Sequence, residues 1–100
     1  MSANDPQRVF AALASTPRRQ IIAFLSQTAL STAELAVRFG MSPPAVSRHL
    51  SLLEDAGLVF GERQGQRVLY RLNRDALLDA LAHFALEVDG PVRRAPRSAL

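Results

Sequence analysis

The feature that most constrains the fold is a pair of helix-start signals separated by a single glycine. Residues 31–34, Ser-Thr-Ala-Glu, form a capping box, in which serine and glutamate each satisfy a backbone N–H group of the first turn. Gly40 can adopt the left-handed conformation that ends a helix. Ser42 then caps a second helix, because the Pro-Pro pair at 43–44 suits a first helical turn. The pattern predicts a helix, a tight turn and a second helix that ends at Gly57.

Helix signals also precede this pair, and a change of hydrophobic period follows it. Asp5-Pro6 and Thr16-Pro17 each combine an N-cap with proline at the first helical position, which predicts one helix from each. From residue 58 to residue 72 the hydrophobic period changes from helical to two, with Val68, Tyr70 and Leu72 alternating with Leu69 and Arg71, and Gln64-Gly65 interrupts the stretch. We therefore expect a β-hairpin with a polar tip over residues 62–67.

The last predicted helix starts after the cap Asn73 and continues to about Val88, because Gly90-Pro91 forbids extension. Together the elements predict a mainly α fold of five helices with a two-stranded β-hairpin, which is the arrangement of a winged helix-turn-helix. In that arrangement the second helix of the central pair enters the major groove of DNA. We expect one folded domain over residues 1–89 and a basic, flexible tail over residues 90–100.

The last helix is too apolar for the surface of a monomer. After its leading arginine, the polar residues up to Val88 are Asp75, Asp79, His83 and Glu87 alone. We expect this helix to pack against its twin across a two-fold axis, together with the first helix, which makes the protein a homodimer. The predicted dimer interface consists of Val9, Phe10, Leu13, Leu77, Leu81, Phe84 and Val88.

Composition excludes several functions. The chain has no cysteine, which removes thiolate metal sites, cysteine nucleophiles and disulfides. No apolar run approaches the length of a membrane span, and we expect a cytoplasmic protein with no membrane partner. All 12 basic residues are arginines, and Arg93, Arg94 and Arg97 lie in the tail, so residues 1–89 carry equal numbers of basic and acidic side chains. Net charge of the folded part therefore does not indicate a nucleic-acid partner, and the positions of the arginines must carry that argument.

Two stretches of the sequence resemble the ArsR (ArsR/SmtB) family of bacterial repressors. The first is Ser-Pro-Pro-Ala-Val-Ser-Arg-His-Leu-Ser-Leu-Leu-Glu-Asp-Ala-Gly-Leu-Val at 42–59, followed by Arg-Gln-Gly-Gln-Arg at 63–67 and Tyr-Arg-Leu at 70–72. The second is residues 10–22, and the resemblance covers roughly residues 8–88. It implies a homodimeric transcriptional regulator, usually a repressor, that binds double-stranded DNA and releases it when an effector binds. The two-fold symmetry predicts an inverted-repeat operator.

The second helix of the central pair buries Val46, Leu50 and Leu53, so its other residues point away from the core. We expect Arg48 to reach a guanine edge or a phosphate. His49 fits two alternatives, a contact with DNA or a hydrogen bond within the helix pair. The predicted DNA-binding residues are Ser42, Pro44, Ser47, Arg48, His49 and Ser51 on this helix, Arg63, Gln64 and Arg67 on the hairpin, and Arg18 and Arg19 at the start of the second helix.

A metal site on the last helix is a minor hypothesis. Asp79, His83 and Glu87 lie at i, i+4 and i+8, and some members of the resembled family bind zinc-like ions with such residues on their last helix. The spacing does not reproduce the ligand pairs of that family, and it equally fits a solvent-facing stripe. We therefore expect no metal and no cofactor, and a small-molecule effector of unknown identity stays open.

Two other classes of function compete with DNA binding. For an enzyme, the sequence has no glycine-rich phosphate loop, no nucleophile elbow and only His49 and His83 as near-neutral acid–base groups, so we expect no catalytic activity. The second alternative is a winged helix that serves as a protein-interaction or dimerisation module without binding DNA.

Overall fold

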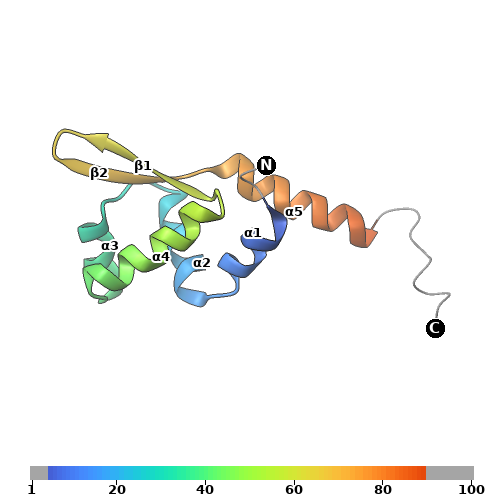
Figure 1. Ribbon diagram of the computed structural model, residues 1–100, viewed down its shortest axis with the longest axis horizontal. Coiled ribbons are helices and arrows are strands. Elements are labelled where there is room, and N and C mark those ends of the chain that lie inside the picture. Colours follow the sequence, from blue (N-terminus) through green and yellow to red (C-terminus); the bar gives the residue numbers. More distant parts are fainter. Residues whose placement is uncertain (1–4, 90–100) are drawn as a thin grey trace.

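The structure, a computed structural model, describes residues 5–89 as five α-helices and one antiparallel β-hairpin (Figure 1). The helices are α1 (Pro6–Leu13), α2 (Thr16–Leu25), α3 (Thr32–Phe39), α4 (Pro43–Asp55) and α5 (Arg74–Asp89), and the strands are β1 (Val59–Gln64) and β2 (Arg67–Leu72). This order confirms the predicted mainly α fold class with its hairpin between the fourth and fifth helices. The predicted tail, residues 90–100, lies outside the described residues.

The helix-turn-helix forms as its capping signals predict. Ser31 Oγ accepts a hydrogen bond from the Glu34 N–H group at 3.1 Å, and Glu34 Oε1 accepts one from the Ser31 N–H group at 2.9 Å. Gly40 closes α3 in the left-handed conformation, with φ of 63°. Ser42 Oγ then accepts a bond from the Ala45 N–H group at 3.2 Å, at the start of α4. These bonds satisfy backbone groups that helix ends leave without partners, and so they fix the turn between α3 and α4.

The predicted start of α2 is wrong by one residue. The helix begins at Thr16, and its N-cap is Ser15, whose hydroxyl accepts a bond from the Arg18 N–H group at 3.4 Å. Serine and threonine both cap helices, and Pro17 fits the second helical position as well as the first. The sequence signal therefore allowed either boundary.

The hairpin tip is shorter than predicted. Strand pairing continues to Gln64 and Arg67, which leaves a two-residue turn of Gly65 and Gln66. Gly65 supplies the positive φ, 67°, that such a turn requires. Backbone groups make the ladder, so the polar side chains of residues 62–64 and 67 do not interrupt it.

The hydrophobic core surrounds the inner side of α4. The predicted inward residues Val46, Leu50 and Leu53 are at most 1% exposed. They belong to one buried cluster with Ile21 of α2 and Leu35 of α3, among others. Burying a side chain of this size contributes roughly 1.5–3 kcal/mol, so this stripe sets the orientation of α4 against the other helices.

A short backbone bridge, which no sequence signal indicated, attaches the hairpin to the helices. The Tyr70 N–H group donates to the Leu30 carbonyl at 2.8 Å, and the Leu30 N–H group donates to the Tyr70 carbonyl at 3.2 Å. Gly61 lies opposite Tyr70, and a Cβ atom at Gly61 would come within 2.9 Å of Val68 Cγ1 and 3.2 Å of Tyr70 Cε1. Glycine at this position therefore leaves room for the tyrosine ring beside β1.

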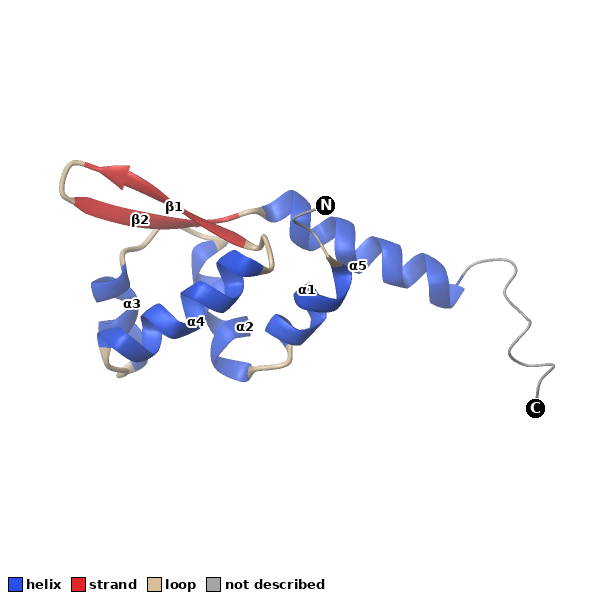
Figure 2. Ribbon diagram, in the orientation of Figure 1, coloured by secondary structure: helices blue, strands red, loops and turns tan. Residues whose placement is uncertain are grey.

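The helix α5 leaves the helical body at the end opposite the hairpin tip, so that the described chain measures 56 × 24 × 24 Å (Figures 1 and 2). Ala76 and Ala80 are the buried residues of α5, and Leu77 is partly buried and packs against the core. Val9, predicted at a dimer interface, is 0% exposed and fills the core of its own chain instead. The apolar pattern of α1 could not separate these two kinds of burial. No helix between residues 5 and 89 has the length and hydrophobicity that crossing a membrane requires.

Candidate nucleic-acid interface

The N-cap and the outer face of α4 carry five of the eleven residues predicted to contact DNA. Ser42, Pro44, Ser47, Arg48 and Ser51 are all exposed. Arg48 has no ion pair or side-chain hydrogen bond with any residue in the range 5–89, so its guanidinium is available to a ligand. Ser42 uses its hydroxyl as the cap of α4, which gives this residue a structural role in addition to any contact with DNA.

His49 lies between α4 and the start of α2. Its Nδ1 atom is 3.4 Å from Arg18 Nη1, and its side chain is half-buried. Partial burial, followed by the positive charges of Arg18 and Arg48, lowers the pKa of His49 below the ordinary value of 6.5. This position favours an internal hydrogen bond over a contact with DNA, although the partner lies on α2 and not within the α3–α4 pair.

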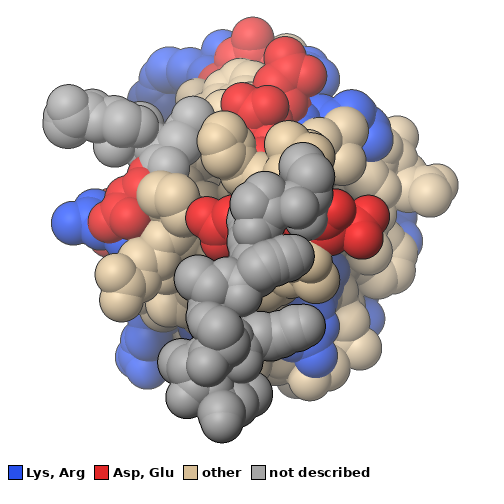
Figure 3. Space-filling view, turned by 90° about the vertical axis from the view of Figure 1, so that its right-hand side faces the viewer, with Lys and Arg blue, Asp and Glu red and all other residues tan. Residues whose placement is uncertain are grey.

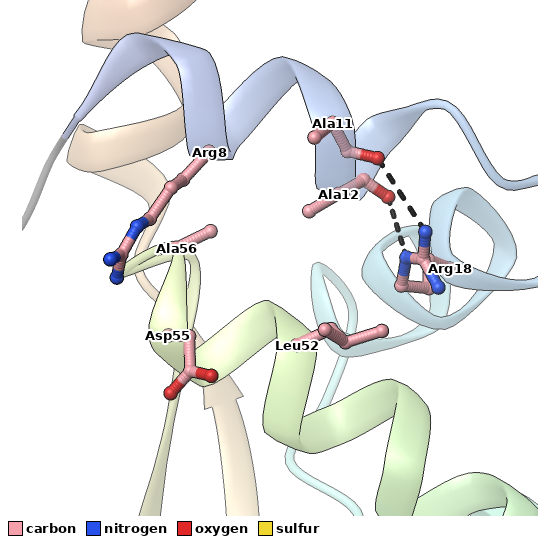
Figure 4. A pocket seen from close by; sticks show the side chains of 7 residues that line it. All are labelled: Arg8, Ala11, Ala12, Arg18, Leu52, Asp55 and Ala56. Atoms are coloured by element: carbon pink, nitrogen blue, oxygen red, sulfur yellow. Dashed lines mark hydrogen bonds between the residues drawn. The ribbon is translucent and has the colours of Figure 1, made fainter.

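Arg18 and Arg19 turn back towards the end of α1. Arg18 Nε donates to the Ala12 carbonyl at 2.8 Å (Figure 4), and Arg19 Nη1 donates to the Leu13 carbonyl at 2.6 Å. The last carbonyls of a helix have no partner within it and carry its negative dipole end, so both arginines stabilise α1 and its junction with α2. The predicted phosphate contact of Arg18 is therefore not supported by its position, and Arg19 has the same internal role.

The arginines of the hairpin differ from each other. Cross-strand partners share a face of the hairpin, and Arg63 pairs with Val68 whereas Gln64 pairs with Arg67. Because neighbouring residues of a strand alternate between faces, Arg63 points to one side, and Gln64 and Arg67 point to the other. Both arginines are exposed, but they lie on opposite faces of the hairpin.

Arg67 has a partner on α3, since its Nη2 atom forms an ion pair with Glu34 Oε1 at 3.1 Å. The hydrogen bond from the Ser31 backbone, more than the charge of Arg67, lowers the pKa of Glu34. Both side chains of the pair are about half exposed, and exposed ion pairs contribute little to stability. The pair therefore orients Arg67 without holding it strongly.

The minor metal hypothesis gains no support from the structure. In the described part of the chain no three His, Asp or Glu side chains come close enough together to hold a metal ion. Asp79 and His83 line a small hollow of about 180 Å³ beside Pro6, whereas Glu87 does not. One more turn of helix separates Glu87 from that hollow, which is why a spacing of i, i+4 and i+8 does not converge on one point.

A capped helix pair with an exposed second helix, followed by a projecting hairpin, defines the winged helix-turn-helix class of DNA-binding proteins. Residues 16–60 match the family described as "Bacterial regulatory protein, arsR family". The chain is 33% identical over 73 residues to the transcriptional repressor SdpR of Bacillus subtilis, and the match covers 73% of this chain and 81% of SdpR. The chain belongs to the ArsR family, and it is a DNA-binding transcriptional regulator.

Two further relatives show how far the similarity extends. The HTH-type transcriptional repressor SmtB of Mycobacterium tuberculosis is 42% identical over 76 residues, which cover 72% of this chain but only 56% of SmtB. The solution structure of a homodimeric winged helix-turn-helix DNA-binding domain from Mycobacterium bovis superposes with a TM-score of 0.69 at 30% identity, covering 87% of this chain and 81% of that domain. The family match thus includes the whole helix-turn-helix, and the similarity spans little more than half of SmtB.

The position of His49 predicts a pH dependence of stability. Folding lowers the pKa of His49. As the pH falls through the ordinary value of 6.5, the unfolded chain therefore binds more protons than the folded chain does. The free energy of unfolding should therefore decrease from neutral pH towards the lowered pKa, and His49→Gln should flatten this part of the profile. Urea denaturation at a series of pH values measures the effect. His83→Gln is the control, and a profile that His49→Gln does not flatten would contradict this role for His49.

Proposed function

We propose that two copies of this chain form a dimer through α1 and α5 and that the dimer represses transcription by binding an inverted-repeat operator. The observation that carries the dimer is the apolar outer face of α5. Leu81, Phe84 and Val88 are 42%, 53% and 70% exposed, and Phe84 lies edge-on against Phe10 of α1 with ring centroids 5.6 Å apart. The two helices thus offer one continuous apolar surface, and surfaces of this kind mark protein interfaces.

Not all predicted interface residues contribute to this surface. Leu13 and Leu77 are half-buried against the core, and they support the interface from behind. The charges around this end of the molecule are mixed, as Figure 3 shows with basic side chains mostly towards the rim of the view and acidic ones at the top and closer to the centre. A mixed, partly apolar end suits a second protein chain better than a polyanion such as DNA.

The dimer places the two α4 helices on one face of the DNA. A two-fold axis sets the recognition helices of such dimers about 34–36 Å apart, one turn of B-DNA, which implies an operator with two inverted half-sites. We assign base contacts to Ser47, Arg48 and Ser51 and backbone contacts to Arg63 and Arg67. Pro43 and Pro44 remove N–H groups from the start of α4, so side chains rather than the helix end anchor the phosphates.

The names of the relatives support repression, since SdpR and SmtB are both called transcriptional repressors. A regulator of this kind acts where the chromosome lies, so we assign the chain to the bacterial cytoplasm, and we assign it no catalytic activity. A second candidate function is a winged helix that binds a protein partner without DNA. The balance of charges within residues 5–89 favours that alternative, because arginines do not outnumber acidic residues there.

Replacement of Phe84 tests the dimer. A glutamate in the centre of the apolar face leaves a charge without a partner when two copies meet, so Phe84→Glu should give a folded monomer with weakened DNA binding. Size-exclusion chromatography with light scattering measures the mass, and circular dichroism checks the fold. Val37→Glu is the matched control, because Val37 is 83% exposed on α3 and belongs to no predicted interface. Equal masses for wild type and Phe84→Glu would argue against the proposed dimer.

Replacement of Arg48 separates the two candidate functions. Duplexes selected from a random pool by the wild-type protein supply the operator, and Arg48→Ala should bind this operator roughly ten- to hundredfold more weakly, as expected for one lost base contact. Its dimer mass should not change. Arg38→Ala is the control, because Arg38 lies over the ring of Phe24, 5.2 Å from its centroid, on α3. If no symmetric sequence is selected, or Arg48→Ala binds as well as wild type, the protein-interaction module is the better reading.

Replacement of Glu34 tests the role of the ion pair with Arg67. Glu34→Gln preserves the capping box, since glutamine serves there too, but it removes the charge that holds Arg67. Operator binding should tighten about two- to fivefold, the range expected for an exposed ion pair. The slope of log K against log salt should change by much less than about 0.9, the value for a whole phosphate contact, because Arg67 contacts a phosphate in both proteins. Fluorescence anisotropy at several salt concentrations measures both quantities, and the same gain in an Arg67→Gln background would rule this explanation out.

A further inference from the structure

A hollow of about 300 Å³ lies between α1, the start of α2 and the C-terminal half of α4 (Figure 4). This volume is at the lower end of the range for small-molecule sites. The lining consists of Arg8, Ala11, Ala12, Arg18, Leu52, Asp55 and Ala56. None of these residues belongs to the DNA interface as assigned above, so the hollow is a separate feature of the molecule.

Two residues of opposite charge line one edge of this hollow. Arg8 extends from α1 and Asp55 is the last residue of α4, and Figure 4 shows both charged ends on one side of the hollow. Within residues 5–89 neither side chain takes part in an ion pair or a side-chain hydrogen bond. Arg18 on the other side differs, because carbonyl groups of α1 and the ring of His49 already occupy its guanidinium. The charges available to a ligand are therefore one guanidinium and one carboxylate.

The rest of the lining is apolar. Ala11, Ala12 and Ala56 form small surfaces, and Leu52 is 44% exposed although it is a leucine on the outer side of α4. A larger hollow of about 440 Å³, with Phe24 and Arg38 in its lining, offers less to a ligand, since the Arg38 guanidinium is already stacked on the Phe24 ring. The hollow beside Arg8 thus combines free charges of both signs with an apolar wall.

We propose that this hollow binds a small zwitterion of amino-acid size with an apolar side chain. The carboxylate of the ligand pairs with the Arg8 guanidinium, whose fork matches a carboxylate in two hydrogen bonds. Its ammonium group donates to the Asp55 carboxylate, and its apolar part covers Leu52 and the alanines. A simple anion or cation fits less well, because it can pair with only one of the two charges at the site.

Such a ligand connects α1 to the helix that reads DNA. Asp55 and Leu52 lie on α4, and Arg8 lies on α1, so a ligand bound to all three favours one orientation of α4 relative to α1. If operator binding requires another orientation, the ligand weakens it, and DNA weakens ligand binding by the same factor. This regulatory consequence rests on the proposed function, whereas the binding site itself does not.

The proposed ligand site is tested in the absence of DNA, so the result of this experiment does not depend on operator binding. The probes are the free L-amino acids, added singly at up to millimolar concentrations to the ¹⁵N-labelled full chain and observed by NMR. At least one amino acid with an apolar side chain should shift the amide signals of Arg8, Ala11, Leu52, Asp55 and Ala56. The amide and the N-acetyl derivative of that amino acid should bind more weakly, since each lacks one charge.

Variants then test whether the Arg8 and Asp55 side chains bind the two charged groups of the ligand. Arg8→Gln and Asp55→Asn should each weaken binding by about tenfold or more, as expected for the loss of a charge-assisted hydrogen bond. Arg38→Gln and Asp79→Asn, which remove the same charges elsewhere, should bind as wild type, and the spectra of all four show whether they are folded. The proposal is overturned if no amino acid shifts the signals of the hollow, or if the shifts persist in the Arg8→Gln, Asp55→Asn double variant.

Discussion

The burial of Val46, Leu50 and Leu53 determines the arrangement of the remaining functional groups. Three side chains spaced by four and three residues fix one face of α4 in the core, and geometry then leaves Ser47, Arg48 and Ser51 on the opposite face. No bond to any of those polar residues is needed to present them. Packing of the buried residues thus determines which side of α4 is exposed. The exposed residues of α4 can therefore differ without changing how the helix packs.

A second set of interactions links the first helices to α4. Arg18 joins the end of α1 to α4, because its guanidinium bonds both to the Ala12 carbonyl and to the ring of His49. The Leu30–Tyr70 bridge joins the hairpin to the loop before α3. The hairpin and α4 are therefore held to the same body by independent contacts. The Arg67 side chain, by contrast, is held towards α3 by an exposed ion pair with Glu34. This pair is weak enough to be replaced by an ion pair with a phosphate.

The parts of this fold that could be predicted are those that short-range chemistry decides. The capping box of Ser31 and Glu34 and the cap of Ser42 involve residues three apart, so the sequence contains both partners of each bond. The burial of Val9 and the internal partners of Arg18 could not be predicted, because these environments come from residues far away in the chain or on another helix. The Leu30–Tyr70 bridge escaped prediction for the same reason, since backbone pairing of a single residue leaves no periodic pattern.

The elongated shape of the chain has a mechanical consequence. The apolar end of α5 and the tip of the hairpin lie at opposite ends of a molecule 56 Å long and 24 Å wide. If α5 is fixed in the interface between two subunits, the rest of the chain rotates about that interface. A tilt of a few degrees there displaces the hairpin tip by several ångströms. Small adjustments of packing at one end are thereby amplified into a change of span at the other.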